Sequence, residues 1–214
     1  MKYDTLIFDL DGTLADTRPG VLACFEYTLN KLGLPPYHDP YKFLGPPLQY
    51  SFSTLLGLDG KATEEAVRIY RQKYRTESIF DAELFNGIED MLHTLKENGY
   101  TLAVATCKVE KFAEIFLKHF SIAKYFDFIG GADENNRVEK SQVIYHVMEE
   151  LGKTDTSRVL MIGDRDNDVK GAEILGIPCL YALWGYGSAE EASESGALTA
   201  VHTPYECLQF VMEK

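Results

Sequence analysis

Two aspartates stand where a short apolar segment near the start of the chain ends. Residues 5–8 (TLIF) have the apolar, β-prone character of a buried strand, and Asp9 and Asp11 come directly after them. A buried carboxylate without a partner is costly, so such a pair needs a cation, a group of backbone amides or a catalytic role. Taken alone, these residues are better explained by a simple turn at Asp11 and Gly12, with Asp9 as its solvated flank.

A second acidic cluster occurs far along the sequence, at residues 164–168 (DRDND), after a predicted strand at 158–162 (RVLMI). In an open parallel sheet, side chains at the carboxyl ends of the strands converge, so we expect this cluster to meet Asp9 and Asp11. Carboxylate and amide oxygens suit Mg²⁺, and crowding them without a cation would cost strong mutual repulsion. The sequence therefore predicts a magnesium site. Asp166 is expected to cap the helix that follows.

A magnesium ion beside a carboxylate, a hydroxyl and a lysine suggests phosphoryl transfer. We expect Asp9 to attack phosphorus and form an aspartyl-phosphate, while the metal offsets the negative charge. Asp11 is then placed to protonate the leaving oxygen and later to take a proton from water. Thr106, at the end of the apolar run 100–105, can donate a hydrogen bond to phosphate. Lys140, at the start of a predicted helix, can complete the anion site, although most lysines in such places are simply solvated.

The elements predicted around these residues alternate between strands and helices. Strand patterns occur at 5–8, 100–106, 125–129, 158–162 and 177–181, and helical patterns at 87–96, 110–119, 140–151 and 167–175. This alternation predicts an α/β fold, a Rossmann-like doubly wound parallel sheet with helices on both faces.

The segment between the first strand and residue 83 has a different texture. Helical patterns occur at 20–32, 48–56 and 63–76, and no convincing strand is found between 15 and 81. We therefore expect residues 1–14 and 84–214 to form the α/β catalytic core and residues 15–83 to form a small all-helical cap domain. Linkers near 15–16 and 81–82 would allow such a lid to close over the site and exclude water.

Composition limits the class of protein. The chain has 214 residues, with 33 acidic and 21 basic side chains and a net charge of -12, which disfavours binding to nucleic acid or anionic membranes. No apolar run is long enough to span a bilayer, and the N-terminus lacks a signal-peptide pattern, so we expect a cytoplasmic protein. Free thiols in a reducing compartment are the simplest account of four scattered cysteines, Cys24, Cys107, Cys179 and Cys207.

Taken in order, these residues resemble the four motifs of the haloacid dehalogenase superfamily. The motifs are residues 9–14 (DLDGTL), Thr106, Lys140 and residues 163–168 (GDRDND). The helical segment after the first motif resembles the cap of the phosphoglycolate phosphatase-like branch, which includes nucleotidase-like members. Residues 43–48 (FLGPPL) and 184–188 (WGYGS) also resemble that branch.

The resemblance implies a role for each motif residue. Asp9 would be the nucleophile and Asp11 the acid/base. The Mg²⁺ ion would be held by Asp9, the backbone carbonyl of Asp11 and Asp164, with Asp168 in or just outside the coordination sphere. The implied phosphate-binding residues are Thr106, Lys140, Gly12 and Cys107.

Two departures from the family pattern bear on these assignments. Cys107 stands in a Thr-Cys-Lys sequence where relatives often carry Thr-Asn-Lys. Lys140 is followed by Ser141 where proline is frequent, which leaves Arg137 as an alternative to Lys140.

These features together predict a Mg²⁺-dependent phosphatase of a small phosphorylated metabolite, similar to phosphoglycolate or a 5′-nucleotide. A phosphomutase or pyrophosphatase of the same superfamily would share the motifs. A phospho-receiver module, which uses similar residues without turnover, is a more distant alternative. Candidate substrate-binding residues in the cap are Arg18, Lys42 and Tyr50, which flank the expected entrance in sequence.

Overall fold

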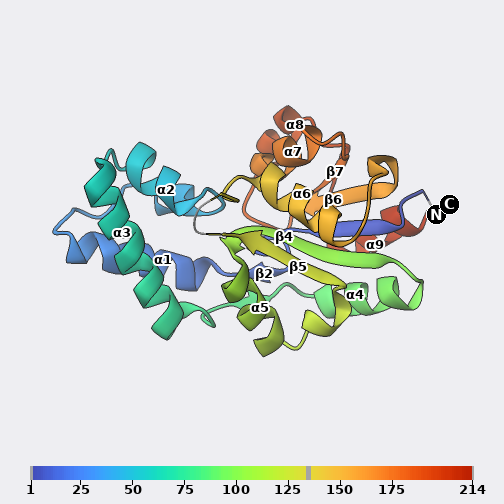
Figure 1. Cartoon of the computed structure of the whole chain (residues 1–214), viewed down its shortest axis with the longest axis horizontal. Helices are drawn as coiled ribbons and strands as arrows, with labels where there is room; N and C mark the ends of the chain where they lie inside the picture. Colours follow the sequence, from blue (N-terminus) through green and yellow to red (C-terminus); the bar gives the residue numbers. More distant parts are fainter. Residues whose placement is uncertain (1, 134–135, 214) are drawn as a thin grey trace. The chain divides into compact units, whose positions relative to one another are not determined.

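The computed structural model describes residues 2–133 and 136–213. The chain divides into two compact units (Figure 1). One, here called the sheet unit, spans Met1–Asp16 and Leu84–Lys214, and the other, the helical unit, spans Thr17–Glu83. Each is described separately below.

The sheet unit is built on six parallel strands in the order β5-β4-β1-β6-β7-β8. Their bounds are β1 Thr5–Phe8, β4 Thr101–Val109, β5 Phe128–Ala132, β6 Val159–Gly163, β7 Cys179–Ala182 and β8 Thr199–Val201. Strand β1 lies in the middle, and Phe8 is in register with Val104 on β4 and Ile162 on β6. The chain order reverses beside β1, so the residues that follow β1 and β6 meet at the switch point, where open α/β sheets bind ligands.

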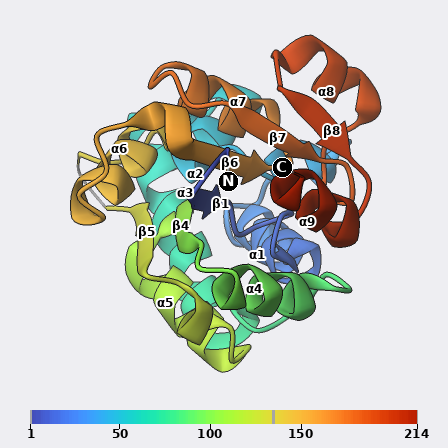
Figure 2. The ribbon, with the colours of Figure 1, turned by 90° about the vertical axis from the view of Figure 1, so that its right-hand side faces the viewer.

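Helices cover both faces of this sheet, as the doubly wound prediction requires. They are α4 Ile88–Glu97, α5 Glu110–His119, α6 Lys140–Glu150, α7 Asp166–Glu173, α8 Ala189–Ser195 and α9 Pro204–Met212. Figure 2 shows α6 and α7 on one side of the sheet and α4, α5 and α9 on the other. Buried side chains of α6 and α7, such as Val143, Val147 and Val169, pack against Ile7 and Met161 of the central strands. The predicted α/β class is confirmed.

The helical unit has its own aromatic core. Its helices are α1 Arg18–Lys31, α2 Leu48–Tyr50 and α3 Gly60–Lys73, with a 3₁₀ turn at Pro40–Phe43. The ring of Phe25 on α1 is stacked on Phe43 at a centroid distance of 4.1 Å, and the rings of Phe52 and Tyr70 lie 5.1 and 4.9 Å away. Phe25 is fully buried, so this cluster joins the elements of the unit.

Several predicted elements differ from those observed. The strand predicted at 125–129 starts only at Phe128, because a 3₁₀ turn occupies Ala123–Tyr125. The expectation of no strand between 15 and 81 is wrong at β2 (Ala15–Asp16), which pairs with β3 (Glu83–Leu84) in a two-stranded sheet. The patterns at 48–56 and 63–76 each end in a π-helical turn, at Ser51–Leu55 and Tyr74–Ser78. A π-helical segment of five residues is too short for hydrophobic periodicity to distinguish it from the end of an α-helix.

Two further observations concern cysteines and membranes. The four cysteines, all within the described part of the chain, are not joined in disulfides, as predicted. Among residues 2–133 and 136–213, every helix is too short or too polar to cross a bilayer.

The aromatic core of the helical unit predicts a local stability effect. Phe25→Ala removes the ring at its centre, and such substitutions cost about 3–5 kcal/mol. We expect faster amide hydrogen exchange in peptides from Thr17–Glu83, with little change in peptides from the strands of the sheet unit. Tyr41→Ala is the control, because Tyr41 is 61% exposed. Equal protection of the helical unit in the Phe25 variant and wild type would contradict this assignment of its core.

Candidate active site

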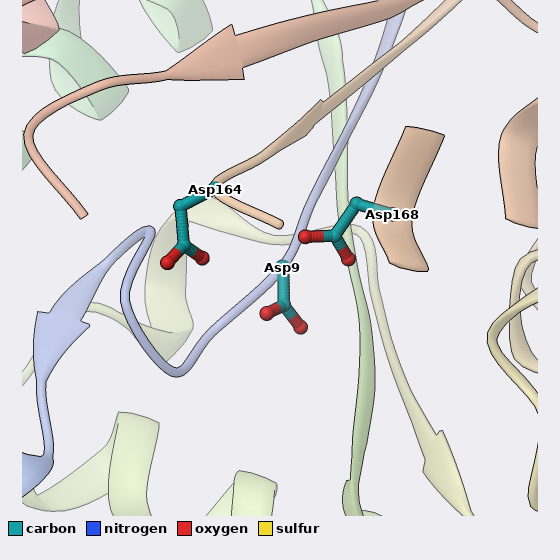
Figure 3. A group of neighbouring side chains, drawn as sticks. All are labelled: Asp9, Asp164 and Asp168. Atoms are coloured by element: carbon teal, nitrogen blue, oxygen red, sulfur yellow. The ribbon is translucent and has the colours of Figure 1, made fainter. Parts of the chain in front are cut away.

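Three buried carboxylates from distant parts of the sequence lie together at the carboxyl edge of the sheet. Asp9 follows β1, Asp164 follows β6, and Asp168 is in the first turn of α7 (Figure 3). Each offers an oxygen, and these oxygens all lie within 4.8 Å of one another. The backbone N–H of Asp9 donates to the carbonyl of Ile162 at 2.9 Å, which continues the pairing of β1 and β6 into the site.

Lys140 is the buried cation of this cluster. Its Nζ lies 2.7 Å from Asp9 Oδ1, 2.7 Å from Asp168 Oδ1 and 2.9 Å from the Ala105 carbonyl oxygen. Lys140 begins α6, directly after Glu139, whose side chain and that of Gln142 form a capping box. The local helix start therefore fixes where the lysine enters the site.

Arg137, the sequence alternative to Lys140, has different partners. Its Nη2 lies 2.7 Å from Glu110 Oε2, and its Nε donates to the carbonyl of Gly131 at 2.7 Å. The backbone N–H of Gly131 donates to the same Glu110 oxygen at 3.2 Å. Arg137 thus ties the loop after β5 to the start of α5, and it is Lys140 that contacts the aspartates.

Asp164 is held by the first motif on one side and by the loop after β7 on the other. Oδ1 accepts a hydrogen bond from the hydroxyl of Thr13 at 3.0 Å, and Oδ2 accepts one from the backbone N–H of Tyr186 at 2.7 Å. A Cβ at Gly12, where φ is +91°, would lie 2.2 Å from Asp164 Oδ2, and one at Gly185 would lie 2.3 Å from Asp164 Cβ. Both positions therefore need glycine for the loops to approach the carboxylate.

Burial dominates the protonation of the cluster. Burial raises the pKa of Asp9 to about 7, against the opposing effect of Lys140. Burial, and then the charges of Asp168 and Asp9, raise the pKa of Asp164 well above its usual value. Burial alone would lower the pKa of Lys140, but Asp168 and Asp9 hold it well above the usual range. With all three carboxylates ionised, the one ammonium group of Lys140 would leave excess negative charge, and an all-oxygen donor set of this kind fits a hard divalent cation such as Mg²⁺.

Asp11 lies beside the cluster, at a less buried position. Its Oδ2 is 2.9 Å from Nζ of Lys108, whose side chain is only 7% exposed. Thr106 is buried, and its hydroxyl oxygen accepts a hydrogen bond from the backbone N–H of Lys108 at 3.2 Å. Strand β4 was predicted to end at Thr106. It instead continues to Val109, with a shift of register between Thr106 and Val109. This shift interrupts the regular alternation of side chains, so the place of Lys108 beside Asp11 rests on the ion pair between them.

Cys107 and Gly12 have contacts that bear on their predicted phosphate-binding roles. The Sγ of Cys107 lies 3.7 Å from Nδ2 of Asn167, and burial raises the pKa of the thiol to about 11, so it is neutral at physiological pH. The backbone N–H of Gly12 donates to the carbonyl of Ala15 at 2.9 Å. That contact closes the turn after β1.

The predicted capping role of Asp166 is wrong. Arg165 occupies the N-cap position of α7, and its backbone N–H donates to Asp168 Oδ2 at 3.1 Å. Asp166 is the first helical residue, and its carboxylate pairs with Lys170 one turn later. The helix is therefore capped by the carboxylate of Asp168, its third residue. One oxygen of Asp168 contacts Lys140 and the other accepts a hydrogen bond from the loop backbone, so this side chain is fixed on both sides.

The substrate-binding candidates Arg18, Lys42 and Tyr50 belong to the helical unit. Arg18 begins α1 and is half-buried, Lys42 is exposed with Asp39 at 4.0 Å, and Tyr50 is 48% exposed.

Sequence reasoning assigned no individual role to four contributors to the site, although three of them lie in motifs that it noted: Thr13, Lys108, Trp184 and Tyr186. Lys108 lies where the register of β4 shifts, so strand alternation from Thr106 does not predict the direction of its side chain. Trp184 Nε1 donates to the carbonyl of Thr13 at 2.9 Å, and Tyr186 contributes a backbone N–H. A backbone donor is independent of side-chain type, so no residue pattern reveals it.

Comparison with known proteins agrees with this geometry. The family model described as haloacid dehalogenase-like hydrolase matches residues 6–182. A 5′-nucleotidase of Pseudomonas aeruginosa is 35% identical over 89% of this chain and 87% of its own length. The tyrosine-protein kinase PtkA of Mycobacterium tuberculosis is 37% identical over 92% of this chain and 68% of its own length.

A crystal structure of a predicted phosphatase from Clostridium acetobutylicum has a TM-score of 0.95 and 35% identity, and the match covers 100% of both chains. A family match over most of the sequence, together with relatives at this level of identity, leads to one conclusion. The chain belongs to the haloacid dehalogenase-like hydrolase family and is a hydrolase of its phosphatase group.

Proposed function

We propose that the protein is a Mg²⁺-dependent phosphatase that hydrolyses a small phosphorylated metabolite through an aspartyl-phosphate on Asp9. The observation that carries this proposal is the buried group of Asp9, Asp164 and Asp168 around Lys140. Such a group has no evident structural purpose, because apolar side chains of similar volume would stabilise the fold as well or better.

Residues of three segments would hold the metal. We assign Asp9, Asp164 and the backbone carbonyl of Asp11 as its protein ligands, with Asp168 beside them in its ion pair with Lys140. When bound, Mg²⁺ would offset the charge of the carboxylates and of the phosphoryl oxygens in the transition state.

The chain's own residues then divide the reaction into two steps. In the first, a carboxylate oxygen of Asp9 attacks phosphorus, the bond to the leaving oxygen breaks, and Asp11 gives that oxygen a proton. In the second, Asp11 takes a proton from water, and the water oxygen attacks phosphorus and releases the Asp9 carboxylate and phosphate. The hydroxyl of Thr106 would donate to a phosphoryl oxygen.

The proposed role of Lys140 follows from its contact with Asp9. Three oxygens, from Asp9, Asp168 and the Ala105 carbonyl, already lie within 2.9 Å of its Nζ. We therefore propose that Lys140 orients the nucleophile and supplies positive charge near the phosphate.

The substrate class rests on the relatives and on the motif resemblance. The 5′-nucleotidase of Pseudomonas aeruginosa favours a 5′-nucleotide, and the phosphoglycolate phosphatase-like motifs favour a small phosphomonoester. Free phosphate released from a panel of both classes, sugar phosphates and pyrophosphate would identify it. A phosphomutase would return an isomeric phosphate ester, and a receiver module would stop after a single phosphorylation.

The helical unit is proposed as the cap. We propose that it forms this cap together with residues 15 and 16, so that residues 15–83 close over the site, and that Arg18 and Lys42 contact the leaving group of the substrate. We also propose that the protein acts in the cytoplasm, which suits four cysteines that form no disulfide among the described residues.

One prediction of the proposed mechanism concerns the two aspartates of the first motif. With p-nitrophenyl phosphate and Mg²⁺, we expect multiple turnover by wild type, background rates for Asp9→Asn and for EDTA-treated protein, and a loss of about 10²–10⁴-fold for Asp11→Asn. The matched control is Asp90→Asn, the same change at an exposed position on α4. Full activity of Asp9→Asn, or of the protein in EDTA, would refute the proposed mechanism.

Another prediction concerns how the stability of the protein, and its increase on adding Mg²⁺, depend on pH. The folded pKa of Asp9, about 7, lies above its unfolded value of about 3.9, so metal-free native protein binds the extra proton between these values. Its stability should therefore fall as pH rises from about 4 to about 7. Because Mg²⁺ competes with that proton, the rise in melting temperature on adding Mg²⁺ should be small at the acid end of this window and large above it. We expect the same pattern for Asp90→Asn, and a Mg²⁺ effect that is constant or largest in acid would be inconsistent with ligation by Asp9.

A further inference from the structure

We propose that Glu191, a residue of α8 outside the four motifs, is a positioning residue that holds the loop at 164–168 in the geometry needed to bind the metal. This inference rests on the proposed use of Asp164 and Asp168 at the metal site. It assigns to Glu191 no contact with substrate or metal.

One oxygen of Glu191 accepts three hydrogen bonds. Oε1 receives the backbone N–H of Asp166 at 2.8 Å, Nε of Arg165 at 3.0 Å and the hydroxyl of Tyr181 at 2.9 Å. Two of these donors belong to residues that lie between Asp164 and Asp168 in the sequence. Glu191 thus contacts the middle of the loop whose two ends carry carboxylates of the cluster.

Arg165 links Glu191 to Asp168. The side chain of Arg165 is bound by Glu191, while its backbone N–H donates to Asp168 Oδ2 at 3.1 Å. The N–H of Asp166, the next donor to Glu191, is one of the first amides of α7, which have no partner within their own helix. Glu191 therefore satisfies this amide and fixes how the first turn of α7 presents Asp168.

Glu191 is itself held firmly. Its backbone N–H donates to Oγ of Ser188, the N-cap of α8, at 3.1 Å, and α8 packs against α7. Tyr181, which donates to its carboxylate, is fully buried at the end of β7. A Cβ at Gly187 would lie 1.9 Å from Oη of Tyr181 and 2.3 Å from the carbonyl oxygen of Asp164, so the chain fits there only as glycine. The loop after β7 and the start of α8 thus form one rigid support for Asp164 and its loop.

The test measures metal binding directly, by titrating the metal-free 214-residue chain with Mn²⁺ and following free Mn²⁺ by electron paramagnetic resonance. Mn²⁺ takes the same oxygen ligands as Mg²⁺. Glu191→Gln keeps the shape of the side chain but removes the charge that attracts Arg165. We expect it to weaken Mn²⁺ binding about 10–100-fold, the usual effect of removing a partner of metal ligands. Glu190→Gln removes the same charge at the neighbouring exposed position of α8 and should bind Mn²⁺ as wild type does.

A second variant and an activity assay distinguish the possible outcomes of this test. Tyr181→Phe removes one of the three donors and should weaken Mn²⁺ binding by less than Glu191→Gln, so it tests the proposal even if the latter variant does not fold. With p-nitrophenyl phosphate, the Mg²⁺ concentration for half-maximal activity should rise in Glu191→Gln, while the rate at saturating Mg²⁺ returns close to that of wild type. Wild-type affinity for Mn²⁺ in folded Glu191→Gln, or in Tyr181→Phe should the first variant not fold, would overturn the proposal. Failure of wild type itself to bind Mn²⁺ would overturn the metal site on which it rests.

Discussion

Repulsion among three buried carboxylates is the constraint that the sheet unit has to satisfy. Two like charges about 4 Å apart repel by about 4 kcal/mol even at the effective dielectric of a protein surface, and burial increases the cost. Lys140 lies between Asp9 and Asp168 and compensates part of this charge. Among the described residues, the hydrogen-bond donors to Asp164 are the neutral groups of Thr13 and Tyr186, so its charge still needs a proton or a cation.

The fold meets this constraint by bringing rigid elements together at one edge of the sheet. β1 and β6 are paired neighbours, and each ends directly before a carboxylate. The loops around Asp164 come so close that Gly12 and Gly185 leave no room for a side chain. Close packing of this kind limits how far the carboxylates can move apart to relieve repulsion, so protonation or metal binding is the remaining response. The same rigidity is what a preorganised site for phosphoryl transfer requires.

Much of this arrangement could be predicted from the sequence, because the strand-end residues follow apolar runs with a clear period. Asp9 and Asp164 were predicted in this way, whereas Lys140 was predicted from its place at the start of a helix; of Lys140 and its alternative Arg137, it is Lys140 that contacts Asp9. Other features depend on contacts between distant segments and left no local pattern. The backbone N–H of Tyr186 and the carboxylate of Glu191 are of this kind. The cap of α7 was assigned to Asp166 because aspartate favours that position, whereas the observed cap uses the backbone of Arg165 and the side chain of Asp168.

The central claim is that these carboxylates share one divalent cation, and calorimetric titration of metal-free protein with Mg²⁺ at pH 8 tests it most directly. The account predicts one Mg²⁺ per wild-type chain and binding at least about 10-fold weaker in Asp164→Asn, which keeps the size of the side chain but removes its charge. Absence of Mg²⁺ binding to wild type, or equal affinity in Asp164→Asn, would contradict it.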